Sequence, residues 1–298
     1  MTPRSHSLYR IAASTLAALL IACASAFAWD SRTHREITHL AIDAMPPSPL
    51  KDFFAANVVQ LESYSVQPDV IRERYGDEDE AVRHYINLEY FGADPFAVLT
   101  PDIAAMNKRF GAAKIRTAGT LPWTIVEFSN SLEQALARGD CGVALRLAGF
   151  LAHYVGDASQ PLHTTINYDG TAQDRGVHMR LERAADYEIA SLGEAARGET
   201  HPIPVESVWP VTIAEIRRAN SHIGEVLASD RAARAEAPRG HAAFSNDLIG
   251  RERPMIVGQL ASGASVLSSI WLYEWKQAGS PAHCAAQIAA PDTPANPQ

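Results

Sequence analysis

The sequence predicts an all-α fold, a single domain of packed helices. Apolar residues recur at three- and four-residue spacing through nearly every long segment, which is the period of an amphipathic helix. Strand-like alternation is not convincing in any segment. The chain has 298 residues, of which 47% are hydrophobic, so it can bury a sizeable core.

Individual helices are predicted from this spacing and from stop signals. The first predicted helix carries Ile37, Leu40 and Ala44 on one face, and Pro46 and Pro47 end it. A second clear helix runs over about 143–157. The polar stretch 167–176, with a glycine near its middle and another at its end, predicts a loop. Further helices are expected near 101–116, 121–137, 177–195, 205–230 and 252–277.

The first 28 residues predict a secretory signal rather than a part of the fold. Arg4 and Arg10 precede an apolar run over 11–22, and a small-x-small site closes the segment at Ala28. The apolar run is well short of the ~20 residues that span a bilayer. We therefore predict cleavage after Ala28, a secreted or periplasmic protein, and no transmembrane segment in the mature chain. The domain is expected over 29–284, and the Ala/Pro-rich tail 285–298 is expected to be disordered.

The charge and the cysteine content bear on whether the protein binds duplex DNA and whether it contains a disulfide. Removal of the signal takes away Arg4 and Arg10 and no acid, so the formal net charge changes from −8 to −10. Such a protein is poorly suited to gripping duplex DNA by phosphate neutralisation alone. Nothing in the sequence implies a stable protein partner. In an exported protein Cys141 and Cys284 form a disulfide or stay as two buried thiols, and the sequence leaves both open.

The most informative string runs from His153 to His163 and reads HYVGDASQPLH. His153 and Asp157 are four residues apart, so on a helix they project from one face. His178 and Glu182 repeat this spacing at the start of the next predicted helix. Imidazole nitrogens and carboxylate oxygens are ordinary zinc ligands, although one such pair alone is more often a surface ion pair.

The whole set of residues changes that interpretation. It resembles the superfamily of bacterial zinc-dependent phospholipases C and fungal-type single-strand-specific nucleases. The resemblance covers the chain from Trp29 to about Glu182 and is strongest over His153–His163. In chain order, the residues that carry it are Trp29, His34, Asp69, His84, His153, Asp157, His163, His178 and Glu182.

The resemblance implies a site with three zinc ions. Asp157 would bridge the first and third ions, and Asp69 would be both a ligand and the proton acceptor for the attacking water. The implied ligands of the first ion are Asp69, His84, His153 and Asp157. Those of the second are His163, His178 and Glu182. Those of the third are His34 and the amino nitrogen and carbonyl oxygen of Trp29.

Zinc suits the implied reaction. A phosphodiester is an anion that repels a nucleophile, and its alkoxide is a poor leaving group. Adjacent zinc ions neutralise the phosphate, lower the pKa of a water toward neutrality and stabilise the departing oxygen.

Two alternatives bear on the third ion. The run that ends at Cys23 also resembles a lipoprotein signal, in which Cys23 becomes the lipidated first residue. That cut would leave Trp29 inside the chain with an amide nitrogen, so the implied site favours the cut after Ala28. His39 is an alternative to His34 as ligand, and the spacing from Trp29 favours His34.

The remaining aromatic and histidine residues have weaker interpretations. Tyr85 follows His84, where the family often has an aromatic residue, and it either contacts substrate or packs in the core. The other histidines fit no ligand spacing and are interpreted as surface or core residues. They are His201, His222, His241 and His283.

The sequence leaves two substrate classes open, phospholipid and single-stranded nucleic acid. The run from His153 to Asn167 is close to the phospholipase C signature and departs from it at Thr165. Glu182 as the acid of the second site and the absence of a Gly-Gly-Asn element over 167–176 also favour phospholipase C. Val70 and the absence of an evident carboxy-terminal lipid-binding domain argue against it.

A third hypothesis is an inactive, zinc-stabilised binding protein. Structural zinc sites are usually closed by four protein ligands and often rich in cysteine. The implied ligand set contains no cysteine and leaves open positions on at least two ions, which favours an enzyme.

Overall fold

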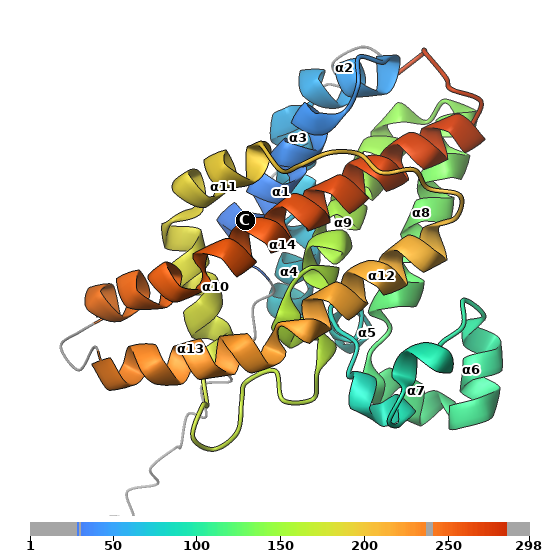
Figure 1. Ribbon diagram of the computed structural model, residues 1–298. Helices are drawn as coiled ribbons and strands as arrows, with labels where there is room; N and C mark the ends of the chain where they lie inside the picture. Colours follow the sequence, from blue (N-terminus) through green and yellow to red (C-terminus); the bar gives the residue numbers. More distant parts are fainter. Residues whose placement is uncertain (1–28, 30, 237–240, 285–298) are drawn as a thin grey trace, which may run out of the picture.

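The computed structural model describes residues 29, 31–236 and 241–284, the side chains of 241–243 excepted, and these residues form helices and no strand (Figure 1). The predictions for the signal at 1–28, for Cys23 within it, for the tail 285–298 and for the side chain of His241 lie outside the described residues. The α-helices are α1 (Ser31–Ala44), α2 (Pro49–Ala56), α3 (Val58–Tyr64), α4 (Gln67–Tyr75), α5 (Glu78–Ala81), α6 (Ile103–Phe110), α7 (Ala112–Ala118), α8 (Leu121–Arg138), α9 (Cys141–Ala158), α10 (Val177–Tyr187), α11 (Ile189–Arg197), α12 (Val208–Ser221), α13 (Ile223–Glu236) and α14 (His241–Gln277). Three short 3-10 helices are η1 (Leu88–Phe91), η2 (Pro95–Ala97) and η3 (Pro161–Thr164). The prediction of a single all-α domain is confirmed.

Three of the long predicted helices are each two helices. The segment predicted near 101–116 breaks at Gly111, whose positive φ of 88° interrupts the helix between α6 and α7. The other two breaks fall at Glu188 and His222, where ψ turns to 11° and −4° without any Pro or Gly. The apolar spacing is helical on both sides of each break, so it does not predict where the helix is interrupted.

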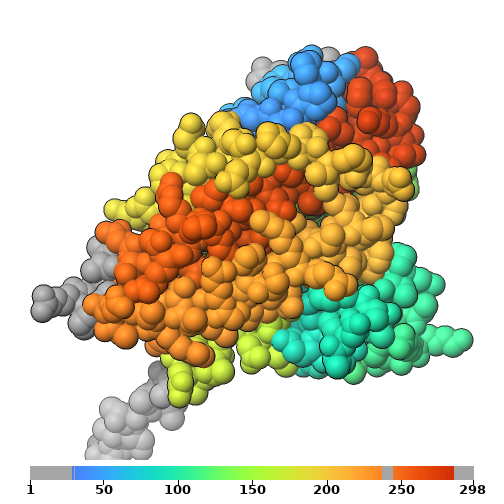
Figure 2. Space-filling model, in the orientation of Figure 1, coloured from blue at the N-terminus to red at the C-terminus, as the bar shows by residue number. Residues whose placement is uncertain are grey.

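Helix α14 is the central element of the fold. It packs against α1, α8, α9, α10, α11, α12 and α13. The space-filling view shows it in a trough between α11 on one side and α12 and α13 on the other (Figure 2). Its start at residue 241 precedes the predicted start at 252, and Pro254 lies inside the helix.

The apolar character of α14 comes from its place in the core. The segment Phe244–Gln277 is long and apolar enough to cross a membrane by length and composition alone, yet 83% of its most apolar window is buried in the protein. Trp271, for example, is fully buried and packs its ring edge-on at 4.7 Å from Phe54 of α2. Burial of this kind is typical of a core helix.

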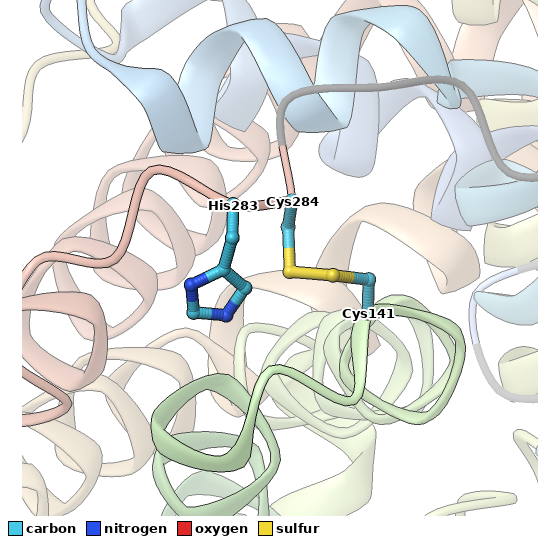
Figure 3. A group of neighbouring side chains, drawn as sticks. All are labelled: Cys141, His283 and Cys284. Atoms are coloured by element: carbon cyan, nitrogen blue, oxygen red, sulfur yellow. A yellow bond between two sulfur atoms is a disulfide. The ribbon is translucent and has the colours of Figure 1, made fainter.

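A disulfide joins the start of α9 to the chain beyond α14. Cys141 and Cys284 are bonded, with Cα atoms 5.5 Å apart and a sequence separation of 143 positions (Figure 3). Of the two alternatives that the sequence left open, the disulfide is therefore the one observed. The imidazole of His283 lies beside it and over Gly139. The bond fixes the amino-terminal end of α9, whose other end carries His153 and Asp157.

Candidate metal centre

Six separate parts of the chain bring the predicted ligands together. All eight of the predicted side-chain ligands are 8% exposed or less. α9 contributes two of them and α10 another two, while α1, α4, the turn after α5 and η3 contribute one each. In that order they are His153 and Asp157, His178 and Glu182, His34, Asp69, His84 and His163.

The carboxylate of Asp157 lies at the middle of this cluster. Its Oδ2 is 3.0 Å from His84 Nδ1 and 3.4 Å from His153 Nε2. Its Oδ1 is 3.6 Å from His34 Nε2 and 3.4 Å from His163 Nδ1. One buried acid therefore contacts four buried imidazoles, each from a different part of the chain.

The first cluster consists of His84, His153, Asp157 and Asp69. His153 Nε2 and His84 Nδ1 lie 2.9 Å apart. Asp69 Oδ1 lies 3.6 Å from His84 Nδ1 and 3.8 Å from His153 Nε2. This is the group of side chains that the resemblance implies for one ion.

The second cluster consists of His163, His178 and Glu182. The Nε2 atoms of the two histidines lie 2.9 Å apart, and Glu182 Oε1 is 2.8 Å from His178 Nε2 and 3.7 Å from His163 Nε2. His163 is placed by η3, which begins at Pro161, three residues after the last residue of α9, while the other two residues share one face of α10. All three donor atoms face one small volume.

His34 reaches the centre from α1. Its ring stacks on His153 with centroids 4.0 Å apart, and its ligand atoms group with those of Asp69 and His153. Gly156 makes this approach possible, because a Cβ there would lie 2.8 Å from His34 Nδ1. The alternative His39 is half-exposed and pairs instead with Asp43 and Glu62 on the surface.

Trp29 lies close to the same end of α9. It is fully buried, and its indole Nε1 donates to Ser159 Oγ at 3.3 Å. Ser159 follows Asp157 by two residues, so the indole anchors the start of the described chain beside the cluster. The role of the Trp29 amine as a ligand stays a prediction.

Main-chain carbonyls fix the orientation of two of the imidazoles. His153 Nδ1 donates to Ser65 O at 2.8 Å, and His163 Nδ1 donates to His84 O at 2.7 Å. A carbonyl only accepts, so in each neutral ring the proton is on Nδ1 and the Nε2 lone pair points into the cluster. Histidines that bind metals are usually oriented by a second hydrogen bond of this kind.

Burial drives the titrating groups of the centre toward their neutral forms. It lowers the pKa values of His34, His84 and His153 well below the ordinary value. Burial, followed by the charge of Asp69, raises the pKa of Asp157 well above its ordinary value. The protein alone therefore places several unprotonated nitrogens and carboxyl oxygens against one another.

A bound cation would satisfy these groups. Both nitrogens of His34, Asp157 Oδ1 and Glu182 Oε2 are buried without a hydrogen-bond partner among the described residues. An unsatisfied buried polar atom costs about 1–3 kcal/mol, and so many in one place call for a ligand. Two ligands of one tetrahedral zinc lie about 3.4 Å apart when each bond is about 2.0–2.1 Å. The separations of 2.8–3.8 Å within the two clusters bracket this value, so the residues fit a metal ion.

The sequence interpretation missed Arg72. It lies on α4, three residues after Asp69, and its Nη2 is 2.8 Å from Asp69 Oδ1. It also lines the cavity beside the metal centre. The only sequence signal was the three-residue spacing of an acid and a base on a helix, which is common on protein surfaces.

A cavity of about 430 Å³ opens beside the two clusters. His84, His163 and His178 form part of its wall, and two tyrosines, Tyr85 and Tyr168, form another part. The ring of Tyr168 stands edge-on to His178 with centroids 5.8 Å apart. Tyr85 thus borders the cavity. Val70, which the sequence left without a role, is about half-exposed on α4. The other residues along the cavity are Arg72, Glu73, Ala81, Asn87 and Leu162.

Comparisons with known proteins place the chain in no family. No family model matches it. A curated relative, a probable serine protease of Bradyrhizobium tropiciagri, is 31% identical over 118 residues, which are 38% of this chain and 15% of the relative. The match covers too little of the relative for the activity in its name to be assigned to this chain.

Proposed function

We propose that the protein is an exported zinc-dependent hydrolase of phosphodiesters. The observation that supports this most is the position of Asp157, whose carboxylate contacts His34, His84, His153 and His163 in a fully buried cluster next to a cavity. A buried carboxylate among four uncharged imidazoles is expected where cations are bound, since the acid is otherwise desolvated without compensation.

The proposed ligands divide as the resemblance implies. His84, His153, Asp157 and Asp69 would hold one ion, and His163, His178 and Glu182 a second. His34 and the amino nitrogen and carbonyl oxygen of Trp29 would hold a third, beside Asp157. When bound, the ions supply neutralisation of the phosphate charge and acidification of the attacking water.

The chain's own residues would perform the remaining steps. The guanidinium of Arg72 would donate two hydrogen bonds to the phosphate oxygens, for which its planar fork is suited. Asp69, 2.8 Å from that guanidinium, would accept the proton of the water. The position of Arg72 on the cavity wall supports an anionic substrate.

We propose phospholipid as the first candidate substrate. The support is the phospholipase-like run from His153 to Asn167, the acid Glu182 and the missing Gly-Gly-Asn element. The net charge of −10 after signal removal also gives weak support to phospholipid. At low salt, an acidic protein repels a polyanionic nucleic-acid strand.

Single-stranded nucleic acid is the second candidate, and the cavity supports it. Tyr85 and Tyr168 both border the cavity, and aromatic side chains stack on bases with about 1–3 kcal/mol each. Asn87 on the same wall offers a donor and an acceptor for a base edge. Arg72 in the cavity is also better suited to a phosphate than to a quaternary ammonium.

The decisive experiment compares substrates on one zinc-loaded sample of the mature protein. Metal content is counted first. Turnover is then measured on a short-chain phosphatidylcholine, on single-stranded DNA and on a nucleoside 3′-monophosphate, with casein as a test of proteolysis. Release of a phosphorylated head group supports phospholipase C, and loss of DNA or of the 3′-phosphate supports the nuclease. Casein cleavage with all three phosphoesters intact would overturn the proposal, as would a metal-free protein that stays inert in excess zinc.

A further inference from the structure

Gln160 lies between the two segments that carry the second cluster. It lies two residues after the end of α9 and is the N-cap residue of η3. Its side chain is fully buried. None of the ligand assignments involves it, although it lies three residues before His163.

The orientation of the Gln160 amide is fixed by its partners. Its Oε1 accepts a hydrogen bond from Leu162 N at 2.6 Å, and its Nε2 donates to Glu182 Oε1 at 2.8 Å. A main-chain N–H requires an acceptor, so the oxygen must face Leu162 and the NH₂ group must face Glu182. Glu182 Oε1 therefore accepts a hydrogen bond from the Gln160 amide, which fixes the position of this oxygen.

Each hydrogen bond fixes one half of the second cluster. The bond from Leu162 N caps η3 and sets the turn on which His163 sits. The bond to Glu182 holds Oε1, the oxygen that also lies 2.8 Å from His178 Nε2. A single buried amide thus sets the distance between a ligand on the turn and a ligand on α10.

The Gln160 amide that donates to Glu182 is uncharged, so it does not compete with a cation for the carboxylate. Within the part of the chain that the structure describes, the ion pairs of Glu182 are with His163 and His178 and with no lysine or arginine. A cationic partner would neutralise the carboxylate and compete with a metal. The amide orients the carboxylate and leaves its negative charge for a bound cation.

We propose that Gln160 is a positioning residue for the second zinc site, joining the His163 turn to the Glu182 carboxylate. This inference rests on the proposed function, since it assumes that zinc binds there. Gln160 does not itself contact the ion. It sets the geometry of two ligands before the ion arrives, so its loss lowers affinity for zinc at this site and leaves the others intact.

The test is a zinc competition titration of the full-length mature protein against a chelator, with zinc alone as the ligand. The titration step that Glu182→Ala removes identifies the second site. Gln160→Met keeps the volume of the side chain and loses both hydrogen bonds. It is expected to weaken that step about 10–100-fold, the usual range for outer partners of metal ligands. The matched control is Gln259→Met, because Gln259 is also buried and donates to the neighbouring Ser159 O at 2.7 Å.

The possible results distinguish failure of the proposed role of Gln160 from failure of the proposed zinc-dependent function. A wild-type protein that binds no zinc overturns both. Wild-type zinc binding with an unchanged second step in Gln160→Met overturns the inference alone, as does an equal loss in Gln259→Met. If Gln160→Met fails to fold, Gln160→Glu keeps the acceptor for Leu162 N and places a carboxylate against Glu182. Weaker zinc binding in that variant supports the inference, and equal or tighter binding overturns it.

Discussion

His163 Nε2 and His178 Nε2 lie 2.9 Å apart, although a turn and a loop separate them in the chain. Because His163 Nδ1 donates to a main-chain carbonyl, the neutral ring of His163 presents a lone pair to His178. Burial also lowers the pKa of His178 to about 3, so this ring is neutral near pH 7. Glu182 Oε1 completes the group. Three electron-pair donors facing one point are the arrangement that zinc binds.

Asp157→Asn is expected to be the most damaging single carboxylate substitution. Asp157 contacts residues of all three predicted ligand groups, so neutralising it weakens more than one ion at once. We expect a lower metal content and more than about 100-fold loss of turnover, beyond the effect of an outer partner. Glu182→Ala should lose one ion only and be partly rescued by excess zinc. Metal analysis and turnover of the two variants check this, and a full metal complement in Asp157→Asn would show that it bridges nothing.

Activity is expected to depend on a free amino group at Trp29. The indole is anchored on Ser159, so Trp29 is held beside the centre. Extra residues before Trp29 convert the amine to an amide, which binds zinc poorly. A protein that retains such an extension, verified by mass spectrometry, should lose one zinc ion and most turnover. Equal metal content and rates with and without the extension contradict the expectation.

Arg72→Ala is expected to lower turnover without lowering metal content. Arg72 lines the cavity and contacts a proposed ligand only through an ion pair. Loss of a positioned donor to a developing anion costs about 10²–10³-fold in turnover. Arg74→Ala is the matched control, because Arg74 lies on the same helix and is exposed. A zinc-loaded Arg72→Ala that is as active as Arg74→Ala would remove Arg72 from the mechanism.

Glu215→Gln is expected to stabilise the protein at alkaline pH. Glu215 on α12 is buried and accepts a hydrogen bond from Ser262 of α14. Burial raises its pKa from 4.5 to about 7. Folding therefore takes up a proton between these values. The stability of the wild type falls as pH rises through this window and is lower by about 3 kcal/mol above it.

Denaturant unfolding of wild type and Glu215→Gln at pH 4, 6 and 8 measures this effect. The free-energy difference between them should grow in favour of the variant as pH rises, because glutamine does not titrate. Glu206→Gln, at an exposed position, is the control for a general charge effect. A difference that is independent of pH contradicts the expectation.

Reduction of the disulfide, or Cys141→Ser, is expected to destabilise the protein by about 2–5 kcal/mol. The bond joins residues 143 positions apart, so its loss raises the conformational entropy of the unfolded chain. Thermal unfolding with and without reductant checks this. Zinc content at low temperature should stay unchanged, because the bond is at the opposite end of α9 from Asp157.

The sequence predicted the fold class and the group of ligand residues better than it predicted where each helix begins and ends. The spacing predicted α8 and α9 to within a few residues, because Gly139 and Pro161 mark their ends. It missed the breaks at Glu188 and His222, since neither has a local signal.

In the candidate site, too, some residues could be predicted from their spacing and others only from the packed structure. His34 and His39 are five residues apart and so lie on different faces of α1, but only the packed structure shows which face meets α9. Arg72 was missed because its three-residue spacing from Asp69 is common on protein surfaces. Gln160 was missed because its contact with Glu182 joins two elements and follows no spacing.

The two clusters differ in how far along the chain their members lie. The second cluster is complete within 163–182, whereas the first needs Asp69 and His84 to meet α9 from far away in the sequence. Closing a short segment costs less chain entropy than closing a long one. Bringing the members of the second cluster together therefore costs less chain entropy than bringing together those of the first. Under the proposed function, the second site is the one expected to bind zinc in a partly folded chain, whereas zinc at the first site would indicate completed folding.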